Sequence, residues 1–104
     1  MSKIDFTQAV TAEQKAAQAS KEAIAALDSA TDRFIEDQAH ALGYKSADRL
    51  AGYVTSSVKD WQAEAQEFVK WRDKVWRDFF KATKNEAELP HVDDLLDALP
   101  RMGT

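Results

Sequence analysis

The chain has no cysteine among its 104 residues, and it has few residues that interrupt helices. The absence of cysteine excludes disulfides, a thiol nucleophile and thiolate metal ligands. Glycine occurs only at 43, 52 and 103 and proline only at 90 and 100, so these positions divide the chain into segments. No apolar run approaches the roughly 18 residues of a membrane span, and no signal peptide is expected after Met1.

Motifs that carry catalysis are also missing. There is no Gly-rich phosphate loop, no HExxH pair and no recognisable Ser–His–Asp arrangement. His40 lies near Glu36 and Asp37, which would permit a loose metal site, but an exposed polar residue on a helix is the better explanation. The formal net charge of −4 argues against a general nucleic-acid binder. We therefore predict no enzymatic activity, no catalytic residue, no metal and no cofactor.

Large aromatic side chains are concentrated in one stretch, residues 61–80. The apolar residues around it recur at steps of three and four, which predicts a long amphipathic helix over 58–84. The repeat places Arg72 in the centre of the apolar stripe. We expect Trp61 and Trp76 to lie in the core, and Trp71 to lie at the edge of the stripe as a candidate interface residue. The aromatics of this stretch are Trp61, Phe68, Trp71, Trp76, Phe79 and Phe80.

The rest of the chain also favours helices. Strong helix formers with a thin apolar stripe predict an N-terminal helix over 7–42, with a weak point at Thr31 and Asp32. Gly43 is placed to end it and Ser46 to cap a short helix over 46–55. A C-terminal helix is expected over 91–99. The predicted fold is a single all-α domain, 1–104, with a long coiled-coil-like helical hairpin, a short connecting helix and a short C-terminal helix.

Two finer capping predictions complete this interpretation. Thr11 followed by Gln14 resembles a capping box for the first helix, and an earlier cap at Asp5 or Thr7 is an equal alternative. Ser56 and Ser57 offer a break or a cap before the aromatic helix, with Asp60 placed for a capping box.

Basic residues are interleaved with the aromatics of the long helix. Such a pattern suits a nucleic-acid or membrane-surface helix, an ordinary solvated face, or pairing with the acidic block that follows. We favour pairing within the chain or with a partner, and expect Arg72 to pair with Asp93, Asp94 or Asp97. The basic residues are Lys70, Arg72, Lys74, Arg77, Lys81 and Lys84, and the acidic ones Glu86, Glu88, Asp93, Asp94 and Asp97.

Two motifs over residues 44–101 resemble a pattern in bacteriophage tail and tail-fibre-associated proteins. Residues 68–76 fit F-x-x-W-R-x-x-x-W, and residues 90–100 fit P-x-x-x-x-L-L-x-x-L-P. The family usually has Thr where this chain has His91, which weakens the expected N-cap. The resemblance implies a virion tail component or an assembly factor without enzymatic activity.

From this we expect a non-enzymatic phage tail or tail-fibre-associated connector that acts by helix-mediated assembly, in the virion tail or in the host cytoplasm during assembly. A tail-fibre assembly chaperone and a small immunity or inhibitor protein remain alternatives. The expected partners are one or two further copies of the chain, as a dimer or trimer, and another phage tail protein, with no nucleic acid and no membrane. The candidate interaction residues are Trp71, Arg72, Trp76, Phe79, Phe80, Asp93 and Asp94.

Overall fold

A computed structural model describes residues 12–103, and every regular element in that range is helical. The α-helices are α2 (Ala12–Ala41), α3 (Ala47–Gly52), α4 (Lys59–Ala82) and α5 (Val92–Ala98). Two short 3-10 helices, η1 (Tyr53–Thr55) and η2 (Glu86–Glu88), lie in the connections. The predicted all-α fold with two long and two short helices is confirmed.

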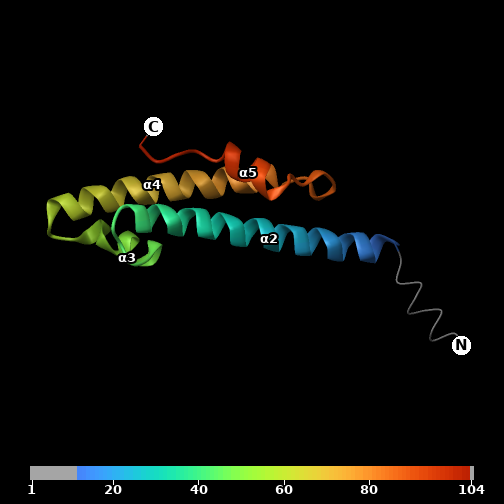
Figure 1. The fold of residues 1–104 in the computed structure, drawn as a ribbon, viewed down its shortest axis with the longest axis horizontal. Helices are drawn as coiled ribbons and strands as arrows, with labels where there is room; N and C mark the ends of the chain where they lie inside the picture. The colour runs from blue at the N-terminus through green and yellow to red at the C-terminus, as the bar shows by residue number, and fades with distance from the viewer. Residues whose placement is uncertain (1–11, 104) are drawn as a thin grey trace, which may run out of the picture.

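The two long helices, α2 and α4, run antiparallel and side by side as a hairpin (Figure 1). The short helices α3 and η1 fill the turn between them, and α5 returns along the hairpin and packs mainly on α2. The molecule is elongated, with extents of 69 × 24 × 18 Å. A shape this narrow leaves much of each helix in contact with solvent.

The core is a thin layer between the helices. From α2 it takes a row at steps of four residues, Leu27, Thr31, Ile35 and Ala39. From α4 it takes Ala65, Phe68, Trp71, Val75 and Phe79. Leu50, Leu95 and Leu99 close it from the short helices and the segment after α5. Burying these side chains contributes roughly 1.5–3 kcal/mol for each large one, so the aromatics of α4 dominate the stability.

The predicted C-terminus of the first helix and the predicted N-cap of the second are confirmed, whereas α3 ends at Gly52 and the predicted stretch to 55 continues as the 3-10 helix η1. Gly43 has φ +94°, and the amides of Gly43 and Tyr44 donate to the carbonyls of His40 and Ala39 at 2.9 and 3.0 Å. This is the Schellman arrangement, which favours glycine because a Cβ is strained at positive φ. Ser46 caps α3, since its hydroxyl oxygen accepts from the Arg49 amide at 3.0 Å.

Other local predictions need correction. α2 passes through Thr31 and Asp32 without a break, because Thr31 is buried and its hydroxyl donates to the Leu27 carbonyl at 2.8 Å. α4 has Val58 at its N-cap with no side-chain cap, so the capping box predicted at Ser57 and Asp60 is wrong. His91 occupies the N-cap of α5 without a side-chain hydrogen bond, as its departure from the Thr pattern predicts. The cap expected at Thr11 lies outside the described residues.

Candidate interaction surface

The most exposed aromatic side chain among the described residues belongs to a cluster at the C-terminal end of α4. Phe80 is 65% exposed, whereas Phe79 beside it is buried and Trp76 is half-buried. The ring of Trp76 stands edge-on to Phe79, with centroids 5.2 Å apart, and Phe80 contacts both rings. The Phe80 ring is therefore fixed against the core by its neighbours, while its outer face is open to a partner.

A second exposed patch lies at the opposite end of α4. Trp61 is 49% exposed and Val58 40% exposed. The Trp61 ring packs only edge-on against Tyr53 of η1, at 5.5 Å, and Tyr53 in turn contacts Tyr44. The prediction that Trp61 lies in the core is wrong, because this turn of α4 faces the small elements of the connection rather than the length of α2.

Beside that patch, Tyr44 is held by a carboxylate. Its hydroxyl donates to Glu64 at 2.7 Å. This hydrogen bond, followed by partial burial and the negative charge of Glu64, raises the pKa of Tyr44 to about 12. The bond ties the loop after α2 to the first turns of α4.

Trp71 is buried in the core although the repeat places it at the edge of the apolar stripe, so the expectation that this position leaves it open to a partner is wrong. It is 7% exposed, and its ring packs against Phe34 and Phe68, each at 5.7 Å between centroids. The indole N–H donates to the Pro100 carbonyl at 2.8 Å. Trp71 thus fixes the segment after α5 onto α4, and Phe79, at 2% exposed, also belongs to the interior.

The predicted pairing of Arg72 with the C-terminal helix is wrong. The Arg72 side chain is one-third exposed, and its guanidinium lies 3.5 Å from Asp73, the adjacent residue. Part of the side chain reaches solvent although the repeat places Arg72 in the centre of the apolar stripe, so it needs no carboxylate from α5. Asp93 and Asp94 are exposed, and within residues 12–103 neither forms an ion pair.

Basic and acidic residues of the chain's second half therefore do not neutralise one another across helices. Apart from the Arg72 contact, the ion pair in the basic cluster joins Lys70 to Glu67 at 3.8 Å, and both side chains are well exposed. Exposed pairs of this kind contribute little to stability. The predicted docking of the acidic block over the basic residues of α4 is wrong for the described chain, because α5 packs mainly on α2.

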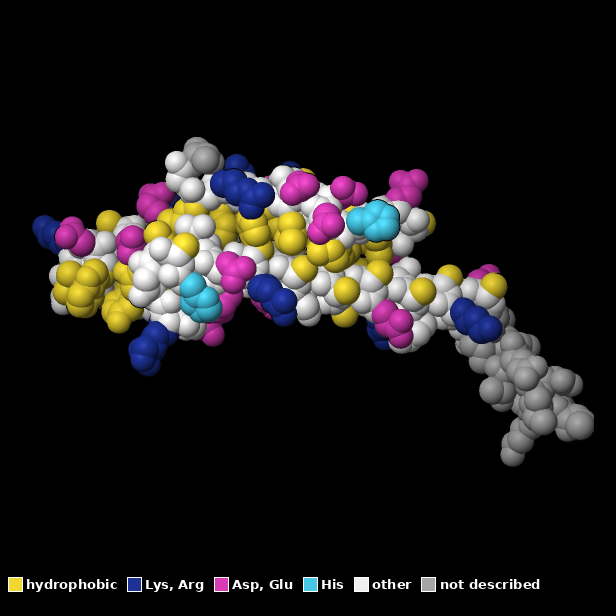
Figure 2. Space-filling view, in the orientation of Figure 1, with side chains coloured by type: hydrophobic (Ala, Val, Ile, Leu, Met, Phe, Trp, Pro, Cys, Tyr) yellow, Lys and Arg dark blue, Asp and Glu magenta, His cyan; other side chains and the backbone are white. Residues whose placement is uncertain are grey.

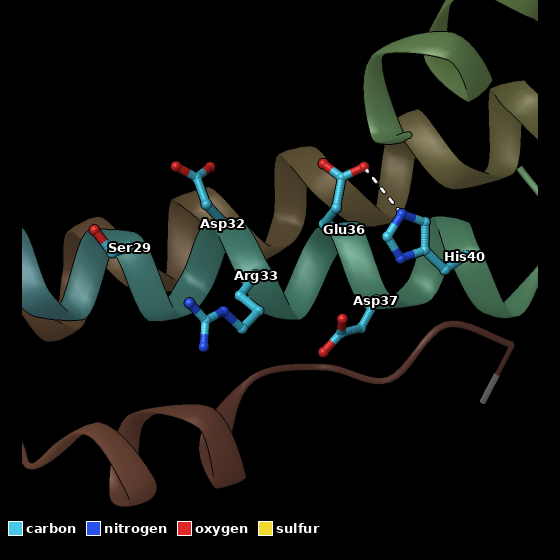
Figure 3. Close-up of a pocket in the computed structure, with 6 residues that line it drawn as sticks. All are labelled: Ser29, Asp32, Arg33, Glu36, Asp37 and His40. Carbon is cyan, nitrogen blue, oxygen red and sulfur yellow. Dashed lines mark ion pairs between the residues drawn. The ribbon is translucent and has the colours of Figure 1, made fainter. Parts of the chain in front are cut away.

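Carboxylates and His40 line a shallow depression on α2 (Figure 3). Glu36 lies 3.6 Å from the His40 ring, but Arg33 and Asp37 point to the other side of the helix. Partial desolvation, then the charges of Asp28, Glu36 and Asp48, raise the pKa of Asp32. No group of three or more metal-ligating side chains lies close enough to hold an ion in the part of the chain that the structure describes.

Comparison with protein-family models, with curated proteins and with solved structures finds no match. Among the described helices, α2 and α4 are long enough to cross a membrane but are not apolar enough, and the others are too short. The exposed apolar side chains and the extended shape suggest a protein partner.

Of the residues singled out from the sequence, Phe80 is exposed and Trp76, expected in the core, is half-buried. Sequence reasoning missed two contacts, Trp71 with Pro100 and Tyr44 with Glu64. Both join segments at least 20 residues apart, and no local pattern encodes them.

Proposed function

We propose that this chain is a non-enzymatic assembly module, a connector associated with a phage tail or tail fibre, that acts through contacts between helices. The observation that supports the proposal most directly is Phe80, a large apolar side chain that is 65% exposed yet fixed by two aromatic neighbours. Rigid exposed aromatics of this kind are typical of the energetic centre of protein interfaces.

The phage assignment rests on the resemblance of residues 68–76 and 90–100 to tail-associated proteins. In this chain the two motifs meet, because Trp71 of the first binds the Pro100 carbonyl of the second. This contact offers a structural reason for the spacing of the two motifs, because it holds the last segment against α4. It supports a shared fold without identifying the partner.

Self-association is the first property to measure. We expect light scattering at micromolar concentration to give the mass of a dimer or trimer. Phe80→Ser should weaken association without lowering the melting temperature, since the side chain is mostly exposed. Trp61→Ser is the matched control, because it removes a similarly exposed aromatic at the other end of α4. A monomer at this concentration would contradict self-association.

Placement in the virion needs a separate experiment. Mass spectrometry of purified particles from the encoding phage should detect the chain in proportion to tail components. Detection only in infected cells, bound to unassembled fibre protein, would favour the assembly-chaperone alternative. Absence from both samples would contradict a tail-associated role.

A further inference from the structure

The outer face of α4 carries a stripe of cations on the side opposite the core. Its members follow one another at steps of four and three residues, and each is exposed. Over the helix they span about 16 Å in length and about 60° of circumference. We call this set the cationic stripe: Lys70, Lys74, Arg77 and Lys81, with Lys84 just beyond the end of α4.

Most of this charge is not neutralised by the part of the chain that the structure describes. Lys70 has Glu67 at 3.8 Å, and the other members have no carboxylate within ion-pair distance among residues 12–103. Trp76 and Phe80 lie along one edge of the stripe, where α4 turns toward its core side. The face therefore combines several unpaired cations with an exposed aromatic, which is typical of a surface that binds an acidic protein segment.

A set of carboxylates of matching size follows in the same chain. We call it the acidic segment: Glu86, Glu88, Asp93, Asp94 and Asp97. All five are exposed, and no ion pair involves them within the described range. Figure 2 shows carboxylates gathered over α5 and the connection before it. The chain thus presents two exposed sets of opposite charge that leave each other unpaired.

The two sets extend along the same part of the molecule. After η2, α5 returns alongside the hairpin (Figure 1). The Pro100 carbonyl lies 2.8 Å from the Trp71 indole nitrogen. The acidic segment therefore lies along the same half of the hairpin as the stripe, on the side where α5 packs on α2. Two such sets can pair reciprocally across a two-fold axis, and a reciprocal pairing closes a dimer.

We infer that the cationic stripe of one copy binds the acidic segment of a second copy, and that Phe80 is covered in the same contact. This inference rests on the proposed self-association and names the surfaces that produce it. A nucleic acid is a poorer occupant, because the carboxylates beside the stripe would repel its phosphates. A second copy neutralises both sets at once, with Leu89 and Pro90, both half-buried, as apolar neighbours for Phe80.

Charge reversal with rescue tests this pairing on the full chain. We expect a dimer by sedimentation equilibrium at 50 mM NaCl, with a dissociation constant at least about tenfold weaker at 500 mM NaCl, since exposed charges are screened by salt. A stripe variant, Lys74→Glu with Lys81→Glu, and an acidic variant, Asp94→Lys with Asp97→Lys, should each be monomeric alone. Their equimolar mixture should recover the dimer.

The matched control is Lys15→Glu with Lys21→Glu. It makes the same change in charge at exposed positions on α2, away from the stripe, and should leave the dimer intact. Circular dichroism checks that each variant folds. Where a reversal does not fold, the neutral pairs Lys74→Gln with Lys81→Gln and Asp94→Asn with Asp97→Asn should weaken the dimer in the same direction.

The possible failures are distinguishable. A dimer that resists salt and both reversals leaves self-association intact and overturns only this pairing. A monomer at 50 mM NaCl overturns self-association as well. A monomer that binds a labelled 20-base-pair DNA at 150 mM NaCl, and loses that binding in the stripe variant, assigns the stripe to nucleic acid and overturns the inference.

Discussion

Trp71 and Trp61 lie ten residues apart on the same helix and should respond very differently to truncation. Trp71 is 7% exposed, contacts two aromatic rings and donates to the Pro100 carbonyl. Trp71→Ala should cost about 3–5 kcal/mol, the range for a large buried aromatic. Trp61 is 49% exposed and packs edge-on against one ring, so Trp61→Ala should cost about 1 kcal/mol or less.

A third variant separates packing from the hydrogen bond. Trp71→Phe keeps most of the buried ring and removes the indole donor, so the loss should be about 1 kcal/mol. In a domain of this size 1 kcal/mol lowers the melting temperature by roughly 4–8 °C. The expected losses are therefore about 4–8 °C for Trp71→Phe and at least about 12 °C for Trp71→Ala.

Thermal melts followed by far-ultraviolet circular dichroism measure all three variants under one condition. Trp61→Ala should melt within a few degrees of the parent chain. Equal losses for Trp61→Ala and Trp71→Ala would refute the reasoning, because they would mean that exposure in this structure does not govern the cost. A Trp71→Phe variant as stable as the parent would show that the Pro100 contact contributes nothing.

Three further perturbations have defined outcomes. Gly43→Ala should destabilise the fold by roughly 1–2 kcal/mol because φ is +94°, whereas Gly52→Ala, at φ −65°, should stabilise it by about 0.4–1 kcal/mol. Both sites have open space for a Cβ, so the difference between the two denaturant midpoints reports the backbone conformation. Tyr44 should titrate near pH 12 in ultraviolet difference spectra, and Glu64→Gln should lower that value. Because the folded pKa exceeds the ordinary tyrosine value of 10.0, the stability from this bond is full below about pH 10 and is lost as the pH rises through about 12. Ser46→Ala should cost about 0.5–2 kcal/mol through the lost cap of α3, measured by the same denaturant midpoints.

The helices could be predicted because their signals are local. Gly43 and Ser46 mark a C-terminus and an N-cap through backbone conformation and one hydrogen bond, each within four residues. The apolar spacing of α4 likewise follows from the helical repeat alone. Such features need no knowledge of what lies opposite a given helix face.

The packing of individual side chains could not be predicted in the same way. Position in an apolar stripe says that a residue faces one side of a helix, but burial requires another element opposite it. Trp61 lies in the stripe and faces only the small elements of the connection, so it stays half exposed. Trp71 lies at the edge and is covered by a segment 29 residues away. The opposite charges of Arg72 and the C-terminal helix were misleading for a related reason, since Arg72 pairs with Asp73, its neighbour in the sequence.

α2 is one continuous helix, but packing against the other helices stabilises only its later turns. Its 30 residues make a rod of about 45 Å, whereas the 24 residues of α4 make about 36 Å. Residues 12–19 are all exposed, and the buried row begins only at Leu27. Isolated helices of this length are marginal in water. The first turns can therefore open without disturbing the hairpin, whose cooperative unit begins near Ile24, which packs against the core, so amide exchange should be protected from there onward and much less protected before it.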